Sequence, residues 1–262
     1  MHIWEVIILG IIQGLTEFVP ISSSGHLVIA QNFFSGASDH LFLEFINIGT
    51  LLALLVYFRL KIITIIQDIF IRKKYALARN IIITALPAGI VGYLLADFIQ
   101  TTAFFGSLVV VMVTLAVVGV IMVVLERLPK ASAVRDGESL SPLRSLIIGL
   151  AQVFALIPGV SRSGSTIIAG RLSGLSSAAA AEYSFLASLP IMIGVTVKIF
   201  VTDREYLSAN LVPLLIGNVA AFVAGIIAVG FLLKYLSRHS LAIFGWYRIG
   251  LAAILAVVLL IQ

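Results

Sequence analysis

Residues 10–30 read GIIQGLTEFVPISSSGHLVIA, and a similar stretch, GLAQVFALIPGVSRSGSTIIA, returns 139 positions later at residues 149–169. The two stretches align without a gap, and seven of the 21 positions are identical. The identities include an S-x-S-G core at Ser22–Gly25 and again at Ser161–Gly164. This pattern indicates an internal duplication in which each half of the chain carries one serine-rich turn between apolar arms.

The two polar turns stand in an otherwise apolar chain. Of its 262 residues, 61% are hydrophobic and 11% are charged, whereas globular domains average about 25% charged residues. A transmembrane helix needs roughly 20 predominantly apolar residues. The sequence predicts one all-α polytopic membrane domain over residues 1–262, with six spans near 41–58, 81–96, 104–125, 183–200, 211–233 and 241–261.

The arms that follow the serine turns, residues 27–34 and 167–172, are too short to cross a bilayer. Irregular backbone at membrane depth is tolerated only where it is buried in protein or lines a wet cavity. We therefore expect two re-entrant helical hairpins, within residues 1–35 and 143–174. The alternative is a pair of full spans with polar kinks.

Three spans separate the two expected hairpins, and an odd number of crossings places the second hairpin on the opposite side of the membrane. The result is a pair of inverted-topology repeats, about 1–125 and 143–262, joined by a cytoplasmic loop at 126–142. Lysine and arginine concentrate in loops 59–79 and 126–144, so the positive-inside rule places both termini outside. The net charge of +5 reflects this orientation, and we expect no nucleic-acid partner. The chain has no cysteine, which excludes disulfides, thiolate metal sites and cysteine nucleophiles.

Inverted hairpins bring their tips together near the midplane, so the two serine turns are expected to share one pocket. Backbone N–H groups at the start of each following helix attract anions such as phosphate, and an arginine adds a planar fork for phosphate oxygens. Two simpler interpretations stay open: the serines, notably Ser22 and Ser24, cap helices, and Arg162 pairs with Glu17. The predicted phosphate-binding set is Arg162, Ser161, Ser163, Gly164 and Thr166.

Glu17, Ser23 and His26 are the candidate catalytic residues. A charge at the bilayer centre costs roughly 2.5–3.5 kcal/mol on insertion scales, which argues against an unpaired Glu17. Ser23 and His26 are three residues apart, and a serine beside a histidine with a nearby carboxylate is the general form of an activated nucleophile. A histidine alone is more typical of a hydrogen-bonded core residue. Predicted supporting residues are Gln13, on the helix face of Glu17, together with Ser22 and Gly25.

These residues resemble the undecaprenyl-diphosphate phosphatase family, also called bacitracin resistance proteins. An (E/Q)-x-x-x-E motif is met by QGLTE at 13–17, and a P-x-S-S-x-G-H motif by PISSSGH at 20–26. A P-G-x-S-R-S-G-x-T motif is met by PGVSRSGST at 158–166, and the likeness extends to EYSFLASLPIMIG at 182–194. One departure is that familiar members have glutamate where this chain has Gln13, which puts in doubt any role that needs two carboxylates.

The resemblance implies hydrolysis of a polyprenyl diphosphate to the monophosphate and inorganic phosphate, which recycles the lipid carrier for peptidoglycan synthesis. It also implies a plasma-membrane homodimer with six spans, two re-entrant hairpins and a site that opens to the outer face. A divalent cation, Mg²⁺ or Ca²⁺, is implied as an aid, with Glu17 as its protein ligand. No organic cofactor is expected.

The expected mechanism is attack by Ser23 on the terminal phosphorus, with His26 as general base and Glu17 orienting it. A competing assignment makes His26 the nucleophile. The alternative function is a transporter or flippase for a phosphorylated lipid, because inverted repeats with broken helices are common in secondary transporters.

Overall fold

A computed structural model describes residues 2–30, 34, 39–128 and 133–261. Within these residues every regular element is a helix, as the sequence predicts. Residues 31–33 and 35 of the first expected hairpin, residues 36–38 after it, and residues 129–132 of the expected cytoplasmic loop lie outside the described part. The helices are α1 (Ile3–Phe18), α2 (Ser23–Ala30), α3 (His40–Phe45), α4 (Asn47–Tyr57), α5 (Arg59–Phe70), α6 (Ala76–Leu94), α7 (Ala96–Thr101), η2 (Ala103–Gly106), α8 (Leu108–Leu125), α9 (Pro142–Val153), η3 (Phe154–Leu156), α10 (Arg162–Leu172), α11 (Ser177–Thr202), α12 (Arg204–Ala209), α13 (Leu211–Leu236) and α14 (Ala242–Ile261).

Six helical segments of the described chain are long and apolar enough to cross a membrane, which confirms the predicted number of spans. The first combines α3 and α4. The helices extend beyond several of the predicted runs, because polar end residues continue a helix that hydropathy alone cuts short. The segments are His40–Tyr57, Ala76–Leu94, Leu108–Leu125, Ser177–Thr202, Leu211–Leu236 and Ala242–Ile261.

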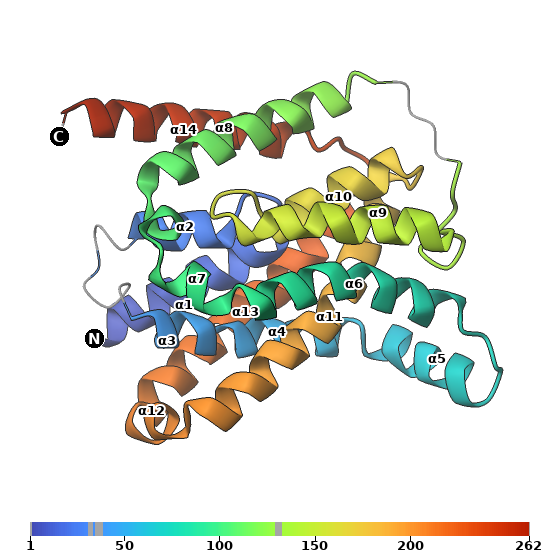
Figure 1. Ribbon diagram of the computed structural model, residues 1–262, viewed down its shortest axis with the longest axis horizontal. Helices are drawn as coiled ribbons and strands as arrows, with labels where there is room; N and C mark the ends of the chain where they lie inside the picture. The colour runs from blue at the N-terminus through green and yellow to red at the C-terminus, as the bar shows by residue number, and fades with distance from the viewer. Residues whose placement is uncertain (1, 31–33, 35–38, 129–132, 262) are drawn as a thin grey trace.

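The two pairs of short helices, α1–α2 and α9–α10, enter the bundle from opposite ends (Figure 1). The α1–α2 pair begins and ends on the left of the view, where both chain termini and α12 also lie. The α9–α10 pair begins and ends on the right, where the basic helix α5 projects. The serine turns of the two pairs therefore approach each other inside the molecule.

The first helix of each pair packs along one long candidate span. Helix α1 packs along α13, and α9 packs along α6, while α8 and α14 pack together across the top of the view in Figure 1. Close approach requires small side chains: a Cβ added to Gly14 would lie 2.4 Å from the Ala221 carbonyl oxygen, and one at Gly119 would lie 2.8 Å from the Gly245 oxygen. Side-chain bulk at these positions would push the helices apart.

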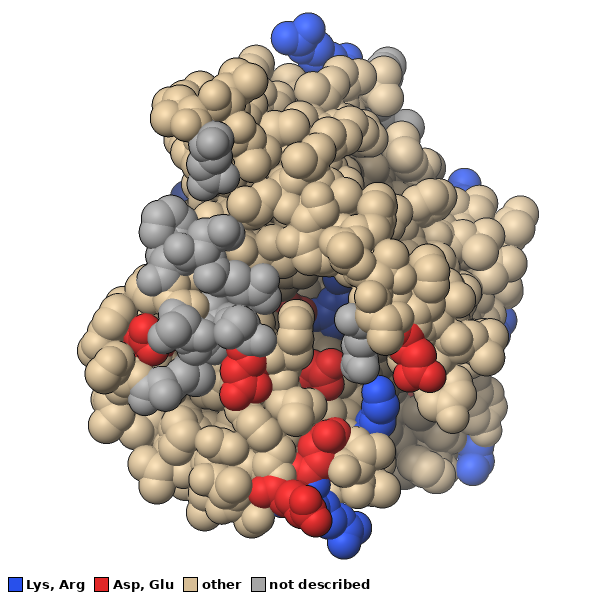
Figure 2. Space-filling model, turned by 60° about the vertical axis from the view of Figure 1, so that its left-hand side comes forward, with Lys and Arg blue, Asp and Glu red and all other residues tan. Residues whose placement is uncertain are grey.

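The apolar core closes over the end of α1. Phe18 is fully buried and meets Phe185 of α11 edge-to-face, with ring centroids 5.5 Å apart. This contact fixes the last turn of α1, which carries Glu17, against the centre of the bundle. Figure 2 shows the face that includes the left side of Figure 1, with a hollow, a basic side chain inside it and acidic side chains nearby.

Candidate active site

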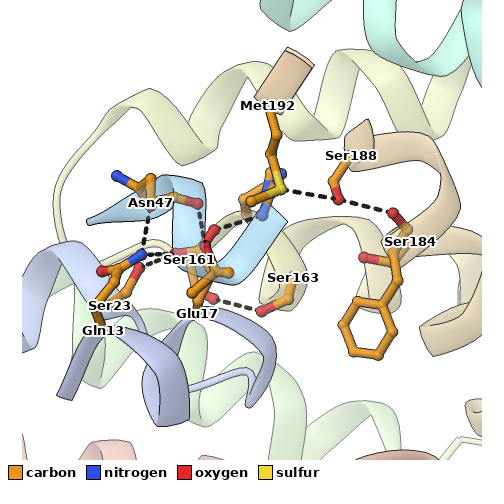
Figure 3. A network of polar contacts seen from close by, with 12 residues as sticks. Gln13, Glu17, Ser23, Asn47, Ser161, Ser163, Ser184, Ser188 and Met192 are labelled. Carbon is orange, nitrogen blue, oxygen red and sulfur yellow. Dashed lines mark hydrogen bonds and ion pairs between the residues drawn. The ribbon is translucent and has the colours of Figure 1, made fainter. Parts of the chain in front are cut away.

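Glu17, in the last turn of α1, joins residues from both serine turns. One carboxylate oxygen, Oε1, lies 2.5 Å from Nη2 of Arg162, and the other, Oε2, accepts hydrogen bonds from Ser23 Oγ at 2.6 Å and Gln13 Nε2 at 3.1 Å. Both members of the ion pair are largely buried, with side chains 12% exposed for Glu17 and 19% for Arg162. Four predicted residues thus form one cluster, most of it drawn in Figure 3.

The two turns have the same backbone geometry, and it explains how they present these side chains. Ser22 and Ser161, 139 residues apart, both have a φ of 75°, in the left-handed region that non-glycine residues seldom adopt. In each turn the serine Oγ accepts from the backbone N–H three residues later, Gly25 at 3.2 Å and Gly164 at 3.1 Å. The sharp reversal ends one apolar arm and starts the next helix, so Ser23 and Arg162 become the first residues of α2 and α10.

Both interpretations left open by the sequence are therefore observed: Ser22 and Ser161 cap their helices, and Arg162 pairs with Glu17. No cap is observed for Ser24 among the described contacts. Ser22 Oγ also lies 3.2 Å from Ser24 Oγ, and Ser161 Oγ lies 3.2 Å from Ser163 Oγ. In each turn the serine Oγ thus caps one backbone N–H group of the helix that follows and lies within hydrogen-bond distance of one neighbouring hydroxyl.

His26 does not make the predicted contact with Ser23. Its Nδ1 lies 2.7 Å from the Ser22 carbonyl oxygen and its Nε2 lies 2.8 Å from Tyr247 Oη, and the two rings are stacked with centroids 5.8 Å apart. A carbonyl can only accept, so Nδ1 carries the proton, and in the neutral ring Nε2 accepts from the tyrosine. Ser23 instead donates to Glu17, because a hydrogen bond to a carboxylate is stronger than one to a neutral ring.

The rest of the predicted phosphate-binding set faces inward. Thr166 is 1% exposed; its Oγ1 lies 2.5 Å from Ser184 Oγ and donates to the Arg162 carbonyl oxygen at 2.8 Å. Ser163 is 3% exposed. These residues fix α10 against α11, so among the described side chains of the second turn it is Arg162 that reaches the Glu17 carboxylate.

Sequence reasoning missed three residues at the site. Asn47, the first residue of α4, accepts from Gln13 Nε2 and donates to the Leu43 carbonyl oxygen at 3.0 Å. Tyr247 and its neighbour Arg248, both on α14, reach His26 and the two turns. An amide or an arginine inside an apolar run was the available signal, because such groups in spans mark functional positions.

Comparison with known proteins identifies the family of the chain. Residues 6–254 match the family described as bacitracin resistance protein BacA. The chain belongs to this family. It is 36% identical to undecaprenyl-diphosphatase 2 of Paramagnetospirillum magneticum, over 98% of this chain and 99% of that protein. It is 39% identical to the undecaprenyl-diphosphatase of Herminiimonas arsenicoxydans, over 94% and 91% of the two chains. It is 37% identical to undecaprenyl-diphosphatase 1 of Clostridioides difficile, over 97% and 95%.

The polar cluster offers a divalent cation one carboxylate, that of Glu17. The described residues contain no group of three or more His, Cys, Asp or Glu side chains that could hold a metal ion. Magnesium is, however, commonly bound through one or two carboxylates together with substrate phosphates. Glu17, with the side-chain oxygens of Ser23 and Asn47 close by, fits a cation that arrives with a diphosphate and does not fit a permanent all-protein site.

Proposed function

We propose that this BacA-family protein hydrolyses an undecaprenyl-type polyprenyl diphosphate to the lipid monophosphate and inorganic phosphate. The observation that carries the proposal is the hydrogen bond from Ser23 Oγ to Glu17 Oε2, 2.6 Å long, beside the guanidinium of Arg162. A hydroxyl, a proton acceptor and a phosphate-binding cation at one point are the requirements of phosphoryl transfer. Near full-length relatives named undecaprenyl-diphosphatase support the same reaction.

The proposed reaction begins when the terminal phosphate binds Arg162 and the N-terminus of α10. The phosphate replaces Glu17 as the partner of the guanidinium, which frees the carboxylate to accept the Ser23 proton. The bond from Ser23 Oγ to phosphorus forms as the bridging P–O bond breaks, and the lipid monophosphate leaves. Water then hydrolyses the phosphoserine and releases inorganic phosphate. His26, oriented by Ser22 and Tyr247, remains the competing nucleophile.

A divalent cation, if bound, would be held by Glu17 and the neighbouring oxygens together with the substrate phosphates. It would supply charge neutralisation of the diphosphate. Ser23 and Arg162 perform their proposed parts as side chains of this chain in either case.

The proposed topology has two re-entrant hairpins in inverted repeats, with the site open to the outer face. The shared φ of Ser22 and Ser161 supports the repeat, and the entry of α1–α2 and α9–α10 from opposite ends supports the inversion. The termini and the basic α5 lie at opposite ends of the molecule, which supports termini outside and α5 in the cytoplasm. A plasma-membrane location and a homodimer complete the proposal by analogy with the family.

An apolar groove offers a place for part of the isoprenoid tail. A cavity of about 480 Å³ lies between α8, α9 and α10, and its lining includes Val160 and Ser165, which are next to the second serine turn in sequence. Its other lining residues are almost all aliphatic or aromatic, among them Val117, Ala151 and Phe154. A hydrocarbon tail could lie against this surface while its diphosphate occupies the polar cluster.

The deciding experiment measures phosphate release by the purified protein from undecaprenyl diphosphate, with and without a chelator. The same preparation in liposomes is tested for movement of a labelled lipid phosphate between leaflets. Phosphate release without lipid movement supports the phosphatase. Lipid movement without phosphate release would establish the transporter alternative instead.

A further inference from the structure

Arg248 is a fully buried arginine in the first half of the last candidate span. It lies on α14 and is 0% exposed. Arginine within a membrane-spanning helix is rare and costly, and such residues normally mark function. The proposed reaction does not use Arg248 directly.

The guanidinium of Arg248 binds both serine turns. Nη1 donates to the Pro20 carbonyl oxygen at 3.0 Å, and Nη2 donates to the Val160 carbonyl oxygen at 3.0 Å and to that of Gly159. Pro20 lies two residues before Ser22, and Gly159 and Val160 lie directly before Ser161. Among the described side chains, Arg248 is the one that donates hydrogen bonds to both turns.

The two turns must be spaced correctly for the site to exist. The first turn leads into Ser23 and the second into Arg162, and these side chains converge on the two oxygens of Glu17. Both serines at the turns have strained left-handed backbones, and such conformations persist only where the surroundings enforce them. A rigid planar fork with five donors can hold carbonyls of two segments at a fixed separation, which a flexible ammonium cannot.

Arg248 also has no acidic partner among the described residues. Ion pairs within the described residues join Lys61 with Glu182, Arg72 with Asp68, Arg162 with Glu17 and Arg171 with Glu126. Arg248 takes part in none of them, and its buried Nε has no hydrogen-bond partner. A fixed positive charge beside two helix N-termini favours an anion at the junction of the turns.

We propose that Arg248 is a positioning residue of the phosphatase: it fastens the Pro20 turn to the Gly159–Val160 turn, and so sets the placement of Ser23 and Arg162 around the reacting phosphate. This inference rests on the proposed function. It predicts an effect on kcat, because misplacement of reacting groups by about 1 Å can cost a factor on the order of 10².

A second buried arginine provides the matched control. Arg171, on α10, has a side chain 7% exposed, donates to the Leu175 carbonyl oxygen at 3.3 Å and also has a partnerless buried Nε. It contacts neither serine turn in the described structure. Loss of Arg171 should therefore lower stability without moving the reacting groups.

The test compares wild type, Arg248→Lys, Arg248→Met and Arg171→Met as purified full-length proteins. For each protein kcat and KM for a lipid diphosphate are measured well below its melting temperature, which is determined separately. We expect kcat of Arg248→Met to fall by about 10²-fold, with partial recovery in Arg248→Lys, which keeps the charge and can donate to some of the carbonyls. Arg171→Met should keep kcat within about twofold although its melting temperature falls.

Two outcomes would overturn the proposal. One is an Arg248→Met or Arg248→Lys protein with wild-type kcat. The other is an equal loss of kcat in Arg171→Met and Arg248→Met that follows their loss of thermal stability. Should Arg248→Met not fold, Arg248→Lys and Arg248→Gln decide the question. A wild-type protein that releases no phosphate would instead refute the proposed function.

Discussion

Arg162 and Glu17 lie 145 positions apart in the chain, and their side chains meet with Nη2 2.5 Å from Oε1. Each charge occupies the helix end that disfavours it. Glu17 is in the last turn of α1, at the negative end of the helix dipole, and Arg162 opens α10, at the positive end. The ion pair stabilises both charges against the helix dipoles, and a phosphate at the start of α10 would stabilise the Arg162 charge equally well. The contact therefore suits a site that exchanges a carboxylate for a substrate anion.

Arg162 is expected to be indispensable for turnover. Arg162→Ala or Arg162→Lys should lower kcat/KM by about 10²–10³-fold, because a lysine cannot reproduce the bidentate fork and a lost transition-state donor costs that much. Phosphate release by purified variants measures the effect, and circular dichroism confirms that the helices are retained. Near-normal release from folded Arg162→Ala would remove Arg162 from the mechanism.

Replacing the acid by an amide at Glu17 should abolish most activity, whereas replacing the amide by an acid at Gln13 should not. Glu17→Gln keeps the shape but removes the proton acceptor of Ser23, and activity should fall by about 10²–10⁴-fold. Gln13→Glu should keep substantial activity, since Gln13 only donates to Glu17 and to Asn47. Two adjacent carboxylates resist joint ionisation, so the acid limb of the pH–rate profile should move to higher pH. An active Glu17→Gln protein would contradict this assignment.

If both positions share a cation, Gln13→Glu should instead make activity more dependent on added Mg²⁺ or Ca²⁺, because a second carboxylate strengthens a hard-cation site. Titration of each protein with metal after chelation distinguishes the two cases. An unchanged metal dependence is expected from the single-carboxylate arrangement.

The identity of the nucleophile can be read from the phosphoenzyme. We expect label from a diphosphate with a radioactive terminal phosphate to be acid-stable and to be absent from Ser23→Ala, because Ser23 contacts the carboxylate. His26→Gln, which keeps a donor and an acceptor near Ser22 and Tyr247, should retain the label. Acid-labile label that survives in Ser23→Ala would identify His26 instead.

Membrane orientation is testable without reference to chemistry, because the chain has no native cysteine. Single cysteines at Lys73 and Ala133 should be protected from an impermeant thiol reagent in intact cells, and one at Asp203 should be labelled. Permeabilised cells give the total labelling for comparison. Labelling at 73 and 133 with none at 203 would reverse the orientation.

The apolar groove between α8, α9 and α10 predicts a chain-length effect. Ala151→Trp should fill the groove and raise KM for undecaprenyl diphosphate severalfold, while a diphosphate with one or two isoprene units is hydrolysed as before. Val219→Trp, on an exposed position of α13, is the control for bulk at a lipid-facing surface. Equal KM values for both substrates in Ala151→Trp would exclude the groove as a tail site.

Much of the architecture could be predicted because it depends on local composition. The six runs that became spans are set by the length of apolar sequence, and the two turns by Pro, Gly and Ser at fixed offsets. Ser22 and Ser161 illustrate the limit. Their equivalence is visible in the alignment, and capping is one interpretation that the sequence leaves open, but their shared φ of 75° is seen only in the structure.

The amino-acid sequence by itself determined the membrane environment, the internal duplication and the chemical character of the site, because hydropathy and residue type act over short stretches of chain. Tertiary structure alone decided which polar groups meet: Ser23 bonds Glu17 and not His26, Gln13 bonds Asn47, and Arg248 reaches turns 228 and 88 residues away. Such contacts depend on the close packing of glycine-lined helices around the two serine turns. Where several donors compete for one buried carboxylate, relative position in space selects the partner, and residue spacing along the chain does not encode that position.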